Sequence, residues 1–277
     1  MNAFEQFLIA IQPKAEEPPM YGLFHISCLV IMIALTVFLV IRFKDADEKY
    51  VRRIFLAAWI LMVVGEVYKQ LVYSFRVDTL AWDYLWYAFP FQFCSSPIFV
   101  IPFIIFMKDC KFRSAVMAYM TTFSFFGGLV TMIYTEQVYT ESIGVNIQTM
   151  VHHGLQVVLG IFLVARNRHR LNKRFFAWAM IVFAGFVGIA MLLNEGVYRY
   201  LLENGMTDEF NMFYISPHFN CTLPILDGIY KAVPYPVFLL IYILGFALIG
   251  AIIYAIDKAM VALAHKIKAA YLNLKNI

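Results

Sequence analysis

Cys94 and His153 are the two residues whose types and positions suit covalent catalysis. A cysteine reacts as its thiolate, and a nearby histidine can accept the proton of the thiol. At a rise of 1.5 Å per residue, Cys94 lies about 12 Å and His153 about 9 Å inside the same end of their predicted helices. This similar depth predicts a nucleophile and a base that meet inside an apolar layer. The alternative is that Cys94 is a small packing residue, the commoner role of a buried cysteine.

Further polar side chains lie at the same depth. A hydrocarbon environment penalises an ionisable group by at least about 2.5 kcal/mol, so such residues are rarely there without a role. Five predicted helices carry polar residues in the same half of their length, while the other halves are almost purely apolar. This alignment predicts a shared polar cavity that opens on one side of a membrane. Besides Cys94 and His153, its predicted lining residues are His25, Glu66, Lys69, Gln92, Ser95, His152 and Asn194.

Two other interpretations of these residues stay open. Glu66 and Lys69 are three residues apart on one helix face, so they can neutralise each other as a structural pair. His25, Glu66, Cys94 and His153 are ligand types that suit zinc, but no local motif supports such a site. We therefore predict no metal ion and no cofactor.

The segment around Cys94 is unusual because Pro90, Pro97 and Pro102 each lack a backbone donor. Such a run of prolines predicts a helix that is bent or broken around Cys94. Irregular backbone at membrane depth persists only where protein or cavity water satisfies it, so broken helices tend to accompany sites.

The composition predicts what must position these residues. The chain of 277 residues is 62% hydrophobic and only 14% charged, which is far more apolar than a soluble domain. A helix that spans the bilayer needs about 20 apolar residues. The fold class predicted is all-α, a polytopic transmembrane helical bundle of about seven spans. The expected spans are Tyr21–Ile41, Ile54–Phe75, Trp86–Met107, Ser114–Tyr134, Ile147–Ala165, Phe175–Val197 and Pro234–Ile256.

Basic residues predict the orientation of the bundle. Of the 22 Lys and Arg residues, 17 fall in alternate loops and the carboxyl-terminal tail, which are therefore expected to be cytoplasmic. The chain then divides into an extracytoplasmic segment 1–19, a transmembrane bundle 20–256 and a cytoplasmic amphipathic tail 257–277. The net charge of +4 comes from these loops and does not imply a nucleic-acid partner. We expect an integral multi-pass protein of the cell membrane whose partners are membrane lipids.

Short motifs in successive predicted helices resemble those of a known family. They are Leu23-Phe24-His25, Gly65-Glu66-Val67-Tyr68, Phe89-Pro90-Phe91-Gln92-Phe93-Cys94-Ser95, His153-Gly154, Asn194 and Leu226-Asp227. With them the chain resembles the YwaF-type integral membrane protein family, related to a eukaryotic transmembrane lysophospholipid acyltransferase. The resemblance implies transfer of a fatty acyl chain between phospholipids, with Cys94 and His153 as the essential pair. Bacterial members often have a histidine where this chain has Gln92, which supplies only hydrogen bonds.

Three functions follow from these observations. The first is a phospholipid acyltransferase, in which Gln92, Ser95 or Asn194 donates a hydrogen bond to the oxyanion. The second is a transporter or small-molecule binding protein that uses the His, Glu and Lys side chains of the polar layer. The third is a structural protein whose polar layer only specifies helix packing.

Overall fold

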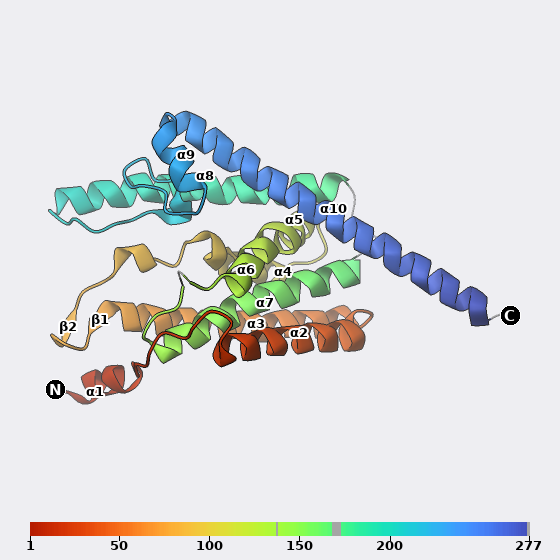
Figure 1. Cartoon of the computed structure of the whole chain (residues 1–277), viewed down its shortest axis with the longest axis horizontal. Coiled ribbons are helices and arrows are strands. Elements are labelled where there is room, and N and C mark those ends of the chain that lie inside the picture. The colour runs from red at the N-terminus through yellow and green to blue at the C-terminus, as the bar shows by residue number, and fades with distance from the viewer. Residues whose placement is uncertain (137, 168–172, 276–277) are drawn as a thin grey trace.

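The computed structural model describes residues 1–136, 138–167 and 173–275, and these are almost entirely helical (Figure 1). Within these ranges six helices are long and apolar enough to span a membrane: α2 (Leu23–Phe43), α3 (Glu48–Ser74), a continuous stretch Lys111–Ile133, α7 (Ile143–Asn167), α8 (Lys173–Glu203) and α10 (Tyr235–Lys275). A seventh apolar helix, α4 (Ser96–Phe106), is shorter. The predicted all-α polytopic bundle is confirmed, with one of its seven spans shortened.

The third predicted span, Trp86–Met107, is not one helix. Its first half contains only the 3-10 turns η1 (Trp86–Ala88) and η2 (Phe93–Ser95), and α4 begins at Ser96. Pro97 lies in the first turn of α4, where a missing donor costs nothing. The 11 residues of α4 cover about 16 Å, roughly half of the hydrocarbon thickness. The prolines therefore leave Cys94 in the short 3-10 turn η2, just before the start of α4.

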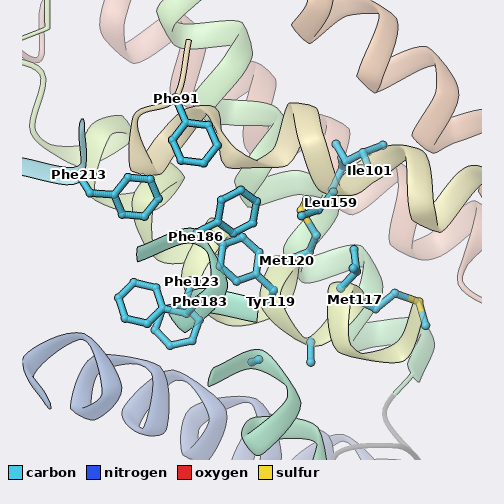
Figure 2. Close-up of a cluster of buried hydrophobic side chains, with 14 of the residues drawn as sticks. Phe91, Ile101, Met117, Tyr119, Met120, Phe123, Leu159, Phe183, Phe186 and Phe213 are labelled. Carbon is cyan, nitrogen blue, oxygen red and sulfur yellow. The ribbon is translucent and has the colours of Figure 1, made fainter. Parts of the chain in front are cut away.

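The stretch Lys111–Ile133 runs through the middle of the bundle. It consists of α5 (Lys111–Tyr119), a π-helical turn η3 (Met120–Ser124) and α6 (Phe125–Ile133). α2, α3 and α7 lie on one side of it, and α8 and α10 lie on the other (Figure 1). Figure 2 shows the aromatic core that joins the two sides, in which the rings of Phe123 and Phe183 stack with centroids 4.5 Å apart.

Two glycines allow the helices around the candidate site to approach closely. A Cβ at Gly128 would lie 2.6 Å from the Cβ of Gln156 and 2.7 Å from the carbonyl oxygen of His153, so α6 rests on the backbone of α7. A Cβ at Gly144 would lie 1.9 Å from the hydroxyl oxygen of Tyr68, which allows α3 to pack against the start of α7. Larger residues at either position would separate these helices.

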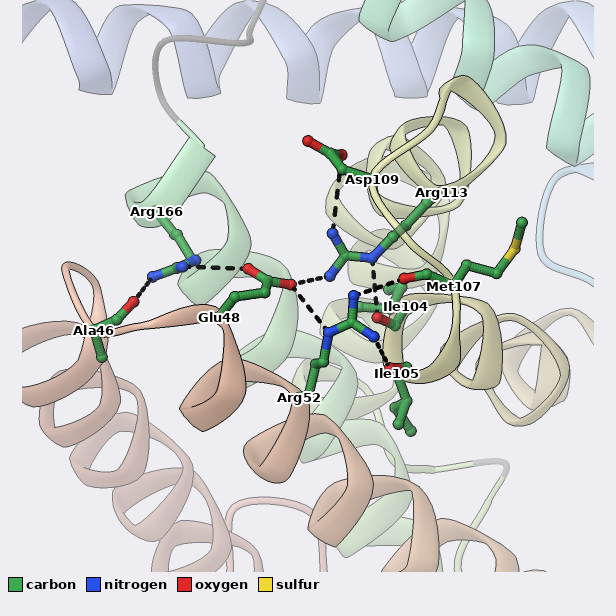
Figure 3. A network of polar contacts seen from close by, with 9 residues as sticks. All are labelled: Ala46, Glu48, Arg52, Ile104, Ile105, Met107, Asp109, Arg113 and Arg166. Carbon is green, nitrogen blue, oxygen red and sulfur yellow. Dashed lines mark hydrogen bonds and ion pairs between the residues drawn. The ribbon is translucent and has the colours of Figure 1, made fainter.

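The two ends of the bundle differ. At the N-terminal end lie α1 (Ala3–Ala10), the hairpin of β1 (Phe75–Arg76) with β2 (Ala81–Trp82), and the end of α8 (Figure 1). At the opposite end, which we call the basic end, Glu48 contacts Arg52, Arg113 and Arg166 (Figure 3). α9 (Leu226–Ala232) precedes α10.

α10 continues without a break from its apolar part through Lys275, so residues 257–275 of the predicted tail extend the last span as one helix. Residues 276 and 277 of that tail lie outside the described residues. The predicted orientation, with the N-terminus outside and the C-terminus cytoplasmic, stays a prediction.

Candidate functional site

The main chain of Cys94 is held by two side chains of α7. His152 Nε2 and Gln156 Nε2 each lie 2.9 Å from the carbonyl oxygen of Cys94. Because the two donors are four residues apart, they project from the same face of α7 and converge on one oxygen. This pair of hydrogen bonds fixes the segment that carries Cys94 against α7. It also satisfies the Cys94 carbonyl oxygen, which lies just before the start of α4.

The hydrogen bonds determine which nitrogen of each neutral histidine carries the proton. The Cys94 carbonyl only accepts, so His152 donates from Nε2 and keeps its lone pair on Nδ1. His153 Nδ1 lies 2.7 Å from the Thr149 carbonyl oxygen, so His153 donates from Nδ1 and keeps its lone pair on Nε2. The rings are neighbours, with centroids 5.4 Å apart. His152 Nδ1 is buried and has no hydrogen-bond partner among the residues that the structure describes.

Glu66 and Lys69 form the ion pair that their spacing predicts, with Lys69 Nζ 2.8 Å from Glu66 Oε1. Gln70 Nε2 donates to the same oxygen at 2.7 Å. Glu66 Oε2 is buried and has no hydrogen-bond partner within the described part of the chain. Counted from the N-terminal end of the bundle, Glu66 in α3 and His152 in α7 lie about 12 Å and 14 Å inside their helices.

Gln92 and Asn194 instead hold a loop. Gln92 donates to the Asn211 carbonyl at 3.1 Å and accepts from the Phe213 amide at 3.0 Å. Asn194 is fully buried; it donates to the Met212 carbonyl at 3.0 Å and accepts from the Met212 amide at 2.7 Å. Both amides are thus committed to main-chain groups of residues 211–213. Of the three predicted oxyanion donors, Ser95 is left, a buried residue next to Cys94.

His25 makes its hydrogen bonds to residues other than those around Cys94. Its Nδ1 accepts from the Tyr21 amide at 2.9 Å, so its Nε2 donates to the Met132 carbonyl at 2.8 Å. The ring is fully buried and connects the start of α2 to the end of α6. Both ring nitrogens of His25 are therefore bound to main-chain groups of Tyr21 and Met132, and a cavity that it shares with the other polar residues stays a prediction.

Sequence reasoning gave no role to Gln156 or to residues 211–213. The signal for Gln156 was present, since it follows His152 by four residues and shares its helix face. No sequence pattern marks residues 211–213, because main-chain groups, which every residue type has, make their contacts with Gln92 and Asn194. Phe213 and Tyr214 have positive φ angles of 60° and 57°, a strained conformation that the loop contacts maintain.

Two apolar hollows flank α3 near these residues. The first, which we call the α3–α7 groove, has a volume of about 530 Å³ and is lined by α3, α7 and the N-terminal segment, with His152 among its lining residues. The second, the α3–α4 groove, has a volume of about 370 Å³, and Glu66 and Gln70 are among its lining residues. Across the described ranges, no three His, Cys, Asp or Glu side chains gather closely enough to hold a metal ion.

Comparisons with known proteins agree with the architecture. The comparison with curated proteins found no match, and neither did the comparison with solved structures. The expected relation to the YwaF-type family stays a prediction. One family of transmembrane proteins matches residues 20–255, which covers the whole helical bundle up to the apolar part of α10. The chain therefore belongs to the TMEM164 family.

Proposed function

We propose that this protein transfers fatty acyl chains between membrane lipids, with Cys94 as the nucleophile and His153 as the base. The observation that carries the proposal is the pair of hydrogen bonds from His152 and Gln156 to the Cys94 carbonyl. They fix the 3-10 turn that carries the Cys94 thiol against the turn of α7 that carries His153. A nucleophile in such a setting needs a positioned base, because the thiolate is the reactive form.

The reaction takes two balanced steps. In the first, the Cys94 thiol gives its proton to His153 Nε2 while Sγ attacks the ester carbonyl of a donor lipid. The C–O bond breaks, His153 returns the proton to the departing glycerol oxygen, and a thioester remains on Cys94. In the second, an alcohol of an acceptor lipid gives its proton to His153 and attacks the thioester. The C–S bond breaks, and the proton restores the Cys94 thiol.

Other residues have supporting roles in this proposal. The hydrogen bond from His153 Nδ1 to Thr149 keeps the lone pair of His153 on Nε2, where a base needs it. His152 and Gln156 are positioning residues, since they contact the Cys94 main chain. Ser95 is the candidate donor to the oxyanion, because its hydroxyl is adjacent to Cys94 and buried.

The thioester itself is the most direct test. The full chain, reconstituted in phospholipid vesicles with an isotopically labelled acyl chain, should gain the mass of that chain on the peptide that contains Cys94. Hydroxylamine should release the label, because it cleaves thioesters. Label found only on another cysteine, or none under conditions in which the protein is folded, would refute the proposed chemistry.

Transport is the second candidate, and the unpartnered oxygen of Glu66 favours it. A buried carboxylate oxygen without a donor, beside Lys69, suits a proton or cation that binds transiently. In that case Glu66→Gln should abolish ligand-dependent flux into vesicles, and Cys94→Ala should leave the flux unchanged. Flux that requires Cys94, or no flux in the native protein with any ligand that binds it, would argue against transport.

A further inference from the structure

We propose that the basic end of the bundle contains a binding site for a phosphate group, carried either by a lipid head group or by a soluble molecule. The site is a cavity of about 470 Å³ among the adjoining ends of α2, α3, α5 and α7. Pockets of this size hold small molecules. Arg52, one of its lining residues, contacts the end of α4 opposite to the Cys94 turn, so the inference does not depend on the proposed acyl transfer.

The wall of the cavity has more positive than negative side chains. Among the described residues its cations are Lys44, Arg52, Arg113 and Arg166, and its anions are Asp45, Glu48 and Asp109. The side chains of Arg113, Arg166 and Arg52 are 5%, 18% and 30% exposed. Those of Glu48 and Asp109 are 44% and 59% exposed, and Asp45 is also exposed. Because water screens exposed charges more than buried ones, the cavity has a positive potential.

The hydrogen bonds of the arginines hold the wall in place without neutralising it (Figure 3). Arg52 and Arg113 donate to carbonyl oxygens at the end of α4, and Arg166 donates to carbonyl oxygens that follow α2. A carbonyl oxygen accepts a hydrogen bond but has no net charge. Within the described part of the chain, Glu48 is the one carboxylate that contacts all three guanidinium groups. A single negative charge therefore lies among three positive ones.

Lys44 and the start of α3 add further positive charge. Lys44 is half-buried, and its ammonium makes no ion pair or hydrogen bond with any residue that the structure describes. α3 begins at Glu48, and the side chain of the preceding residue, Asp47, makes no capping hydrogen bond. The N-terminus of a helix attracts anions through its free amides and its dipole. A phosphate group suits this wall, because it combines negative charge with several oxygens that accept from guanidinium and ammonium groups.

A purely structural role for these side chains is the alternative. In that case the arginines only cap the ends of α2 and α4, and Glu48 balances their charge. This role explains the contacts of Arg52, Arg113 and Arg166, but it leaves the ammonium of Lys44 beside the cavity without a partner among the described residues. It also predicts that phosphate added to the protein has no specific effect.

The test measures the unfolding temperature of the full chain in detergent against increasing ligand. The ligands are inorganic phosphate, dioctanoyl phosphatidic acid and dioctanoyl phosphatidylcholine, with sodium chloride at equal ionic strength as the reference. A ligand that binds only the folded state raises this temperature. Phosphatidic acid should give a saturable rise at lower concentration than phosphatidylcholine, because its phosphate group is more negative and is not covered by choline.

Two matched pairs of variants locate the site. Lys44→Gln should weaken binding of phosphatidic acid about fivefold, the usual effect of one basic residue beside an anionic lipid. Lys49→Gln removes the same charge from an exposed position of α3 and should leave binding unchanged. Glu48→Gln should tighten binding, since it removes the negative charge among the arginines and keeps the size of the side chain. Glu195→Gln, at the opposite end of the bundle, should have no effect.

The outcomes decide both the site and the source of the phosphate. Equal weakening by Lys44→Gln and Lys49→Gln would show a general effect of surface charge and would overturn the site. Equal effects of phosphatidylcholine and phosphatidic acid, or no saturable rise with either phosphatidic acid or inorganic phosphate, would also overturn it. A Lys44-dependent rise with phosphatidic acid alone would assign the site to a lipid head group. The same dependence with inorganic phosphate, at similar concentration, would assign it to a soluble phosphate.

Discussion

Replacement of Cys94 by Ala is expected to abolish acyl exchange in proteoliposomes, because in the proposed mechanism Cys94 carries the acyl chain between the two lipids. His153→Ala should lower the rate by about 10²- to 10⁴-fold, the usual contribution of a positioned base. Product formation would be followed by mass spectrometry of lipids whose two acyl chains differ. Unchanged exchange in either variant would rule out the proposed pair.

The other cysteines supply matched controls for this experiment. All four cysteines are free thiols, and Cys28 of α2 is, like Cys94, a partly buried residue of the bundle. Cys28→Ala should therefore keep nearly full activity. A loss of activity in Cys28→Ala equal to that in Cys94→Ala would indicate a general effect on folding.

The two adjacent histidines should give different results. His153→Ala removes the proposed proton acceptor, so the maximal rate should fall without recovery at any pH. His152→Gln retains an N–H donor for the Cys94 carbonyl and should restore much of the activity that His152→Phe loses. If His152→Phe is fully active and His153→Ala is not, the contact with the Cys94 carbonyl is only structural.

Glu48→Ala is expected to lower the stability of the bundle by roughly 1–2 kcal/mol, because the buried Arg113 loses a counter-charge while the Glu48 side chain itself is 44% exposed and partly screened by solvent. Glu48 is the shared carboxylate of Arg52, Arg113 and Arg166, and Arg113 is only 4% exposed (Figure 3). Without Glu48, Arg113 keeps a hydrogen bond to the Ile104 carbonyl and a 4.0 Å approach to Asp109. A buried guanidinium would lose its nearest counter-charge, so thermal unfolding in detergent should begin at a lower temperature.

An exposed ion pair at the other end of the bundle provides the control. Arg199 and Glu195 are in contact at 2.6 Å, but their side chains are 70% and 42% exposed. Arg199→Ala should change stability by less than about 1 kcal/mol, as is usual for surface pairs. Equal losses in Glu48→Ala and Arg199→Ala would show that the network at the basic end has no special role in joining α3, α4, α5 and α7.

Much of the architecture follows directly from local sequence. Hydrocarbon is about 30 Å thick, so each long apolar run must form a spanning helix wherever it packs. The six long helices therefore lie where their apolar runs predict, and the prolines around Cys94 predict the break that shortens the third span. The Glu66 and Lys69 pair is also local, because both residues belong to one helix face.

The membership of the candidate site was decided by the tertiary structure. The sequence gives the depth of each polar residue along its own helix. It does not give the position of that helix in the bundle or its rotation about its own axis. Which helices become neighbours depends on side-chain packing across the whole bundle, such as the close approach of α6 to α7 at Gly128. That packing binds His25 to main-chain groups of Tyr21 and Met132, and it turns Gln92 and Asn194 toward residues 211–213. Successive residues of a helix point about 100° apart, so only the rotation of α7 determines that His152, and not His153, contacts the Cys94 main chain.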